Sequence, residues 1–224
     1  MTRGVNPHFL MVQLPAALDS TAYLQGAAQL AVEYGGEVLA SAPADAVECL
    51  EADSPAAAML LAEFDEQQSV DAFWSNDRQQ VIFDQLKPTP GVVALSVAGL
   101  PYEGLPDALE IPTIASMTPP ENRGPHTHMI VQGSSTDQAR MDQYRDIILP
   151  MIKEQGAYYI AFEIEGNVNL LCGEWRYDIF AISRWPDHAA GHAFWDSDRY
   201  QNTAIPVRTG AGEFLVHYLP GIAR

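Results

Sequence analysis

The sequence predicts an α+β protein in which two βαββαβ units follow each other in one chain. The first supporting observation is an internal repeat: residues 72–78 (AFWSNDR) return as residues 193–199 (AFWDSDR), a shift of 193 − 72 = 121 positions. The second is that both halves show the same order of strand and helix patterns. A repeat of about a hundred residues has the size of a domain, so the pattern indicates a duplicated domain and not a solenoid.

In the first half, short apolar runs alternate with stretches of helical periodicity. These patterns predict, in order, a strand at 9–14, a helix at 21–34, strands at 37–41 and 57–64, a helix at 67–80 and a strand at 92–97.

The second half begins with an apolar strand at 128–132, followed by a loop at 133–136 whose hydroxyl groups can cap a helix. The helix that follows repeats apolar residues at spacings of three and four between positions 141 and 152. Gly156 stands where a glycine commonly ends a helix.

The remaining elements of the second half complete the same order. The aromatic run at 157–162 and the segment at 177–185 predict two strands. Pro186 opens a second helix that continues to about Tyr200, and 214–218 predicts the closing strand. The agreement between the halves supports both interpretations.

A proline-rich segment separates the two units. Residues 101–125 hold six prolines, which favours neither a helix nor a central strand. We therefore expect a first domain at 1–100, a linker at 101–125 and a second domain at 126–224.

Each βαββαβ unit is expected to form a four-stranded antiparallel sheet in the order 4-1-3-2, with both helices on one face. The other face then needs cover. Along the strands, successive residues are apolar on both sides, which is typical of a sheet buried on both faces. We expect the sheets of the two halves to cover each other.

At several of these positions each half resembles the dimeric α+β barrel superfamily, and most closely the domain of unknown function 1330. The resembling features are the tyrosines of the first helices, the glycines after those helices and the repeated aromatic segments: Tyr23, Tyr144, 35–36, Gly156, 73–77 and 194–200. The resemblance covers about residues 7–100 and 125–220. It implies two ferredoxin-like units fused as an intrachain dimeric α+β barrel. Superfamily relatives include cofactor-independent monooxygenases, haem-degrading enzymes and small isomerases, so the resemblance favours a small-molecule pocket without assigning a reaction.

The composition limits which binding partners and which cellular compartment are expected. The 29 acidic and 12 basic residues give a formal net charge of -17, which disfavours binding to nucleic acid and to anionic membranes. The cysteines Cys49 and Cys172 form no CxxC pair, which disfavours a disulfide framework or structural zinc site and suits a reducing compartment. With no signal-like N-terminal segment or long apolar run, we expect a cytoplasmic protein that binds a small organic molecule. A homo-oligomer of the fused unit remains open.

The histidines are distributed unevenly between the two copies. Five of the six lie in the second copy, and the aligned first-copy residues are not histidine. The five, each followed by its first-copy counterpart, are His126 (Pro7), His128 (Phe9), His188 (Gln67), His192 (Asp71) and His217 (Ser96). The scaffold therefore does not require these imidazoles, which are either functional or incidental.

Three polar residues of the second copy are candidate catalytic residues. With the third strand taken as parallel to the first, the expected strand order places His128 near Asp178 and His217 at one end of the sheet. A carboxylate beside an imidazole fixes its tautomer and raises its basicity, and two imidazoles with one carboxylate can also bind a divalent metal. The plainer interpretation is three separate side chains on different faces or at frayed strand ends.

Further candidates concern substrate and metal binding. Arg184 could hold a substrate carboxylate or make an ordinary ion pair, and Tyr144 and Trp195 could position an aromatic substrate. His188 and His192, four residues apart on one helix, could chelate a metal, but a solvated or subunit-contact face is favoured and we assign no metal ligand. The sequence requires no cofactor and leaves haem or a divalent metal open.

These patterns favour a small-molecule enzyme of the monooxygenase, isomerase or lyase kind with one pocket in the second half. In this hypothesis His128 or His217 moves a proton and Asp178 orients it. The alternative is a non-catalytic ligand-binding or assembly module.

Overall fold

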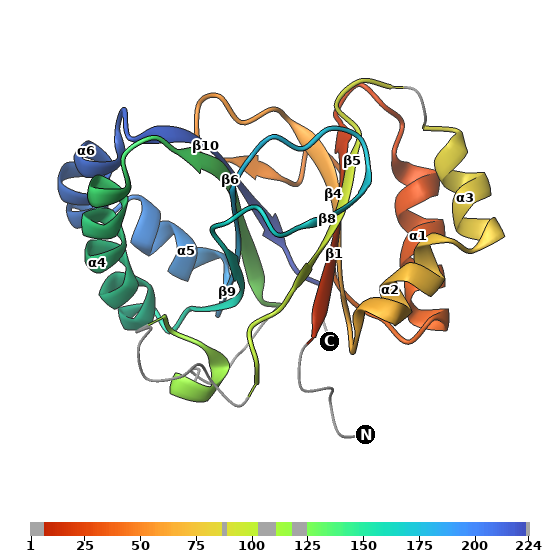
Figure 1. Cartoon of the computed structure of the whole chain (residues 1–224), viewed down its shortest axis with the longest axis horizontal. Coiled ribbons are helices and arrows are strands. Elements are labelled where there is room, and N and C mark those ends of the chain that lie inside the picture. The colour runs from red at the N-terminus through yellow and green to blue at the C-terminus, as the bar shows by residue number, and fades with distance from the viewer. Residues whose placement is uncertain (1–6, 87–88, 103–110, 118–124, 223–224) are drawn as a thin grey trace.

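The computed structural model describes residues 7–86, 89–102, 111–117 and 125–222. Two β-sheets face each other at the centre, and helices cover the outer side of each (Figure 1). Across the described residues, no helix is both long and apolar enough to span a bilayer.

The first half follows the predicted order, with one helix divided in two. Asn76 adopts an extended backbone and its side chain accepts a hydrogen bond from the Arg78 amide, so a new helix begins where a single helix at 67–80 was expected. The elements are β1 (His8–Pro15), α1 (Thr21–Glu33), β2 (Glu37–Ala42), β3 (Glu48–Cys49), β4 (Ala57–Phe64), α2 (Gln67–Trp74), α3 (Asp77–Asp84) and β5 (Val93–Ala98).

The second half repeats the order, with the short strand β8 at the place of β3, and adds extra helical turns. Its elements are the 3-10 turn η1 (Ile114–Ser116), β6 (Thr127–Ser135), α4 (Gln138–Glu154), β7 (Tyr158–Glu163), β8 (Asn169–Cys172), β9 (Ile179–Trp185), α5 (His188–Trp195), the π-helical turn η2 (Tyr200–Ala204), α6 (Ile205–Arg208) and β10 (Gly212–Pro220). Within the expected linker, residues 103–110 and 118–124 lie outside the described residues. The domain boundaries stay a prediction.

The two sheets exchange strands. Their orders are β2-β4-β1-β5-β8 and β3-β10-β6-β9-β7. The four strands from one half follow the expected order 4-1-3-2 in each sheet, but the expectation of four-stranded sheets was wrong. Each sheet gains a fifth strand from the other half, because β8 pairs with β5 and β3 pairs with β10. Both exchanged strands come from the connection between the second and third strands of their unit, and they cover an otherwise open sheet edge.

The apolar core has three layers, as expected for sheets buried on both faces. One cluster lies between the two sheets and includes Met11, Leu61 and Ile182. The second lies between the first sheet and α1–α3, and the third lies between the second sheet and α4–α6. The halves therefore cover each other's inner faces, which confirms the predicted sheet-to-sheet pairing.

Candidate functional site

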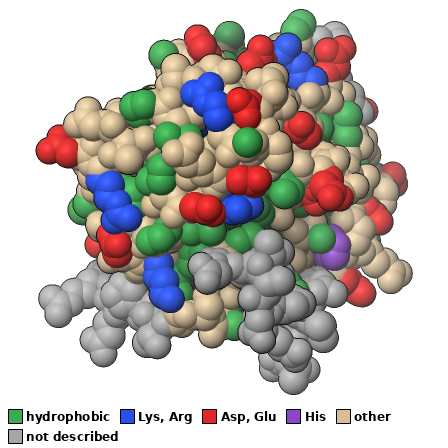
Figure 2. All heavy atoms as spheres, turned by 60° about the vertical axis from the view of Figure 1, so that its left-hand side comes forward, with side chains coloured by type: hydrophobic (Ala, Val, Ile, Leu, Met, Phe, Trp, Pro, Cys, Tyr) green, Lys and Arg blue, Asp and Glu red, His purple; other side chains and the backbone are tan. Residues whose placement is uncertain are grey.

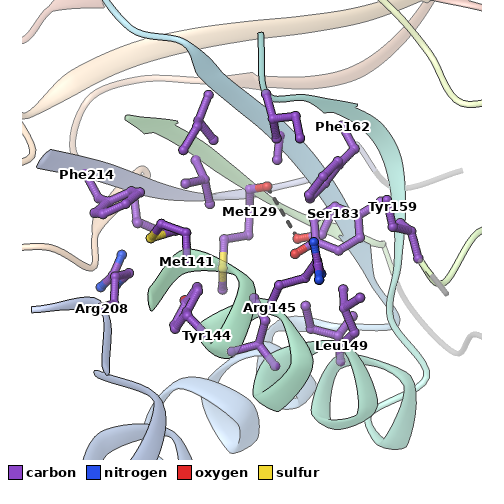
Figure 3. A pocket seen from close by; sticks show the side chains of 18 of the residues that line it. Met129, Met141, Tyr144, Arg145, Leu149, Tyr159, Phe162, Ser183, Arg208 and Phe214 are labelled. Carbon is purple, nitrogen blue, oxygen red and sulfur yellow. Dashed lines mark hydrogen bonds between the residues drawn. The ribbon is translucent and has the colours of Figure 1, made fainter. Parts of the chain in front are cut away.

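A pocket of about 530 Å³ lies between the second sheet and α4. Sites for small molecules commonly occupy about 300–1,000 Å³. Its walls are mostly apolar, and Figure 3 shows several of these side chains turned toward one cavity: Met129, Met141, Leu149, Tyr159, Phe162 and Phe214. The pocket is therefore large enough for a small organic molecule with a sizeable apolar part.

The surface around the α4 side of the molecule mixes charged and apolar side chains. Figure 2 turns this side toward the viewer, and acidic side chains lie across it among a few basic ones, with apolar side chains visible between them. Asp142 and Arg145 of α4 line the pocket and bond to each other at 3.0 Å between Arg145 Nη1 and Asp142 Oδ1. This ion pair therefore adds charged groups to the mostly apolar wall of the pocket.

The size of the side chains explains why space remains in the second half. Ala181 of β9 lines the pocket, whereas the aligned residue of β4 is Leu60, which is fully buried beneath the helices of the first half. On α4, Ile148 and Ile152 line the pocket at the positions aligned with Ala27 and Ala31 of α1. A small residue on the sheet and larger residues on the helix leave a gap between them, whereas the first half has the opposite arrangement.

Two tyrosine hydroxyls form a hydrogen-bonded pair in the wall of the pocket. Tyr144 Oη and Tyr200 Oη lie 2.9 Å apart and share one hydrogen bond. Burial raises the pKa of both phenols, so both stay protonated at neutral pH. Since only one of the two protons is used between them, the other remains available to an acceptor on a bound molecule.

The first half uses the same positions differently. Tyr23 and Gln79 stand at the positions aligned with Tyr144 and Tyr200, and Gln79 Nε2 donates to Tyr23 Oη at 3.0 Å in a filled core. Tyr200 is therefore a functional candidate that the sequence analysis missed. The signal was the exchange of glutamine for tyrosine between the copies.

A buried cation stands beside the tyrosine pair. The Arg208 guanidinium carbon lies 5.5 Å from the centre of the Tyr144 ring and 4.8 Å from that of Phe214. Arg208 is 6% exposed and makes an ion pair with Glu51, which belongs to the first half. The first half therefore supports this end of the pocket through Glu51, and no pattern in the sequence pointed to Arg208.

The expected cluster of His128, Asp178 and His217 does not form. Strands β6 and β9 run antiparallel, with His128 opposite Arg184 and Gly133 opposite Ile179. The Asp178 amide donates to the Gly133 carbonyl, so Asp178 lies about five residues along β6 from His128, roughly 17 Å at about 3.4 Å per residue. The convergence was wrong because the third strand is antiparallel, not parallel, to the first.

The two histidines face the core between the sheets and not the pocket. His128 and His217 are at most 1% exposed, and on the paired strands β6 and β10 they lie opposite Leu219 and Ile130. His217 Nε2 donates to the Pro55 carbonyl at 2.9 Å, and burial lowers the pKa of His217. The strand register matches His217 with Leu95 of the first half, not with Ser96 as the constant shift suggested.

The remaining predicted site residues divide between two places. Asp178, Tyr144 and Trp195 line the 530 Å³ pocket. Arg184 instead points between the sheets, where its Nη2 lies 3.8 Å from Glu63 Oε2. Both side chains of this pair are less than a tenth exposed, and they border a separate cavity of about 90 Å³. Arg184 therefore makes the ion pair that the sequence analysis left open, with the residue at the aligned position of the other half.

The donor atoms in the pocket differ from those that haem iron usually requires. Histidine and cysteine are common axial ligands to haem, and neither occurs among the described residues that line the pocket. Methionine serves as a haem ligand together with histidine, which the described lining lacks, so Met129 and Met141 do not suffice. Tyr144 and Tyr200 are hydrogen-bonded to each other and held protonated. The donor set does not favour haem.

Comparison with known proteins assigns the second half to a family. Residues 126–222 match the model of a family described as a domain of unknown function (DUF1330). The match covers nearly all of the second half of the chain and none of the first. No curated protein sequence matches the chain.

Solved structures extend the likeness to both halves. A "putative monooxygenase" from Fusobacterium nucleatum superposes with a TM-score of 0.51 at 8% identity, over 99% of this chain and 98% of that one. A "putative monooxygenase" from Lactobacillus acidophilus gives a TM-score of 0.49 at 10% identity, over 98% and 99% of the two chains. An "anthrone oxidase-like protein" gives 0.49 at 14% identity, over 98% and 93%. At 8% identity the likeness to the Fusobacterium protein concerns the fold alone, which is that of the dimeric α+β barrel, with the family-matched half as one of its two units.

Proposed function

We propose that this protein is a small-molecule enzyme of the monooxygenase, isomerase or lyase kind, whose single reaction site is the pocket of the DUF1330 domain. The observation that carries the proposal is the protonated Tyr144–Tyr200 pair beside Arg208 in a pocket whose walls are mostly apolar. A mostly apolar cavity with a few convergent polar groups is typical of substrate-binding sites.

The chemistry of the pocket defines the class of substrate. Its apolar walls suit a hydrocarbon or aromatic body, while a protonated hydroxyl and a guanidinium favour an oxygen that carries or develops negative charge. We infer a substrate with an aromatic or polycyclic body and one phenolic or enolisable carbonyl oxygen.

The pocket residues have separate roles in this proposal. A Tyr144 or Tyr200 hydroxyl donates to the substrate oxygen and stabilises the phenolate or enolate that forms when a proton leaves. The Arg208 charge supports that anion from behind the tyrosine ring. Asp178 is the member of the predicted catalytic group that lines the pocket, and we assign it the proton-accepting role. Asp142 is the weaker choice because Arg145 engages it.

The test combines ligand binding with turnover. The fluorescent probe 1-anilinonaphthalene-8-sulfonate joins an aromatic body to one anionic group, and we expect it to bind the native protein with one site. Turnover is then screened by mass spectrometry and oxygen uptake over a panel of phenols and polycyclic ketones. Tyr200→Phe should keep probe binding but lower kcat for an accepted substrate, because it removes a donor without emptying the pocket.

The matched control is Gln79→Leu in the first half, which should change neither binding nor turnover. Failure of the native protein to bind the probe, or equal kcat in the Tyr200→Phe and Tyr144→Phe variants and the native enzyme, would overturn the proposed site. Binding of many panel members without conversion of any would support the non-catalytic binding module instead.

A further inference from the structure

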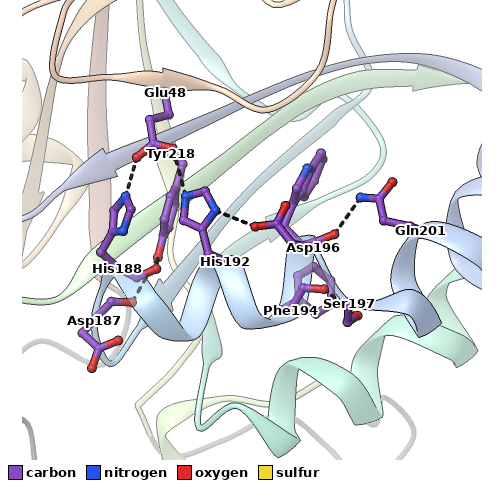
Figure 4. Close-up of polar contacts among 10 residues, drawn as sticks. Glu48, Asp187, His188, His192, Phe194, Asp196, Ser197, Gln201 and Tyr218 are labelled. Carbon is purple, nitrogen blue, oxygen red and sulfur yellow. Dashed lines mark hydrogen bonds and ion pairs between the residues drawn. The ribbon is translucent and has the colours of Figure 1, made fainter.

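A second group of polar side chains lies at the edge of the second sheet, outside the pocket. Glu48 of β3, from the first half, is paired with Tyr218 of β10, and its carboxylate reaches His188 and His192 of α5 (Figure 4). Glu48 Oε2 lies 2.9 Å from His192 Nε2, and Glu48 Oε1 contacts His188 Nε2. The three ligand-type atoms lie within 4.8 Å of one another.

The scaffold beneath this group holds the two imidazoles in place. His188 and His192 are one helical turn apart, with ring centres 4.6 Å apart, and both rings pack on Tyr218. Gly191 allows this packing, because a Cβ atom there would lie 2.1 Å from Tyr218 Oη. Tyr218 Oη in turn donates to the Asp187 carbonyl at 3.0 Å at the start of the helix.

A further carboxylate sets the orientation of one imidazole. Asp196 Oδ2 lies 2.9 Å from His192 Nδ1, on the side of the ring away from Glu48. Figure 4 shows the chain of contacts from Glu48 through His192 to Asp196. A carboxylate on the second ring nitrogen is the usual outer partner of a metal-binding histidine, since it turns the other nitrogen toward the metal.

The aligned positions at the edge of the first sheet carry no histidine. There the aligned residues are Asn169 of β8, Gln67 and Asp71 of α2, and β8 is the strand donated by the second half. Gln67 Nε2 bonds to Asp71 Oδ1 at 2.8 Å, and Asn169 Nδ2 bonds to Ser96 Oγ at 3.4 Å. The fold is therefore maintained by amide contacts at this position, and it does not require two imidazoles and a carboxylate.

We propose that Glu48, His188 and His192 form a site for a divalent transition-metal ion, with zinc as the best-suited ion, at the junction of the two halves. Two imidazoles and one carboxylate match the donor set of open three-ligand zinc sites. In a tetrahedral site, donors about 2.0–2.2 Å from zinc lie about 3.4 Å from each other, so the most widely separated of these atoms must approach by up to about 1.4 Å when the ion binds. The His188 side chain is 60% exposed, which leaves room for a solvent ligand.

Isothermal titration of the full chain with zinc chloride provides the test. We expect one zinc ion per chain and a rise in the melting temperature, because the ion binds the folded protein and ties β3 of one half to α5 of the other. Glu48→Gln and His188→Gln should each weaken binding by at least about 100-fold. Asp196→Asn, which alters the outer partner alone, should weaken it by about 10–100-fold.

Three control variants separate this site from adventitious binding. Cys49→Ser removes the neighbouring thiol, His126→Gln removes another histidine, and Asp71→Asn changes the aligned place in the first half; all three should bind zinc like the native chain. No saturable zinc binding, or unchanged affinity in a Glu48→Gln/His188→Gln double variant whose metal-free melting curve matches the native one, would overturn the proposal.

Discussion

Gln13 and Gln132 meet in the core between the two sheets, where Gln132 Nε2 donates a hydrogen bond of 2.9 Å to Gln13 Oε1. Their separation of 119 residues is the offset that relates the first strands of the two units, so the same position of each copy touches its own counterpart. Residues can meet in this way only close to an axis of approximate twofold symmetry. The buried amide pair therefore marks where the two halves of the chain are related.

The amide pair should be strongly coupled. Gln132→Leu leaves the Gln13 amide buried without this partner, and we expect a loss of about 1–3 kcal/mol in the free energy of unfolding. The double variant Gln13→Leu/Gln132→Leu should recover part of that loss, because neither polar group remains. Urea unfolding of the native chain, both single variants and the double variant measures the coupling. Additive single effects would show that the amides contribute independently.

Ligand binding in the pocket should weaken when the pocket is filled by the leucine that occupies the aligned position of the first half. Ala181→Leu introduces the Leu60 side chain at the aligned position, and we expect affinity for the naphthalene sulfonate probe to fall at least about tenfold. The reverse change, Leu60→Ala, removes a fully buried side chain and should cost about 2–5 kcal/mol of stability while leaving probe binding unchanged. Fluorescence titration and urea unfolding of both variants make the comparison, and equal probe affinity in Ala181→Leu would place the probe elsewhere.

Gly191 should be intolerant of any side chain. A methyl group there would meet Tyr218 Oη, so Gly191→Ala must push α5 away from β10, and we expect a loss of about 1–3 kcal/mol. Zinc affinity should fall as well, since the two imidazoles move with the helix. Gly26→Ala in α1 is the control, because its Cβ would meet the flexible end of Ile82 at 3.2 Å. Thermal unfolding of both variants decides whether the close approach matters.

Stability should depend on pH through His217. Burial lowers the pKa of His217 below its ordinary value of 6.5, so the unfolded chain takes up a proton at that residue more readily than the folded chain. The contribution to stability is therefore fully present above pH 6.5 and is lost as the pH falls from there through the folded pKa. His217→Leu, which installs the residue matched by strand register, should reduce the difference in urea midpoint between pH 5 and pH 7.5. The more exposed His126 serves as control in a His126→Gln variant, and an unchanged pH difference in His217→Leu would contradict the assignment.

Most of the fold could be predicted because both copies bury their strands on two faces and repeat the same order of elements. The exchanged strands could not, since β3 and β8 span only two and four residues and carry too little pattern. One wrong strand direction explains why the predicted catalytic cluster does not form. If the third strand were parallel to the first, Asp178 would lie near His128, but the observed antiparallel register separates the two residues. Tyr144, Trp195 and Asp178 do line the pocket, but the contribution of Arg208 and Glu51 depends on contacts between halves that no local pattern contains.

The exchange of β3 and β8 makes each unit incomplete without its neighbour. A fragment that contains only one half of the chain would lack the outermost strand of its sheet. It would also carry a short strand, β3 or β8, that has no partner because it pairs with the sheet of the absent half. Two such fragments produced together should find each other and rebuild the whole, whereas each one alone should be prone to self-association through its bare edge. The exchanged strands therefore make the pairing of the two units obligatory in this chain.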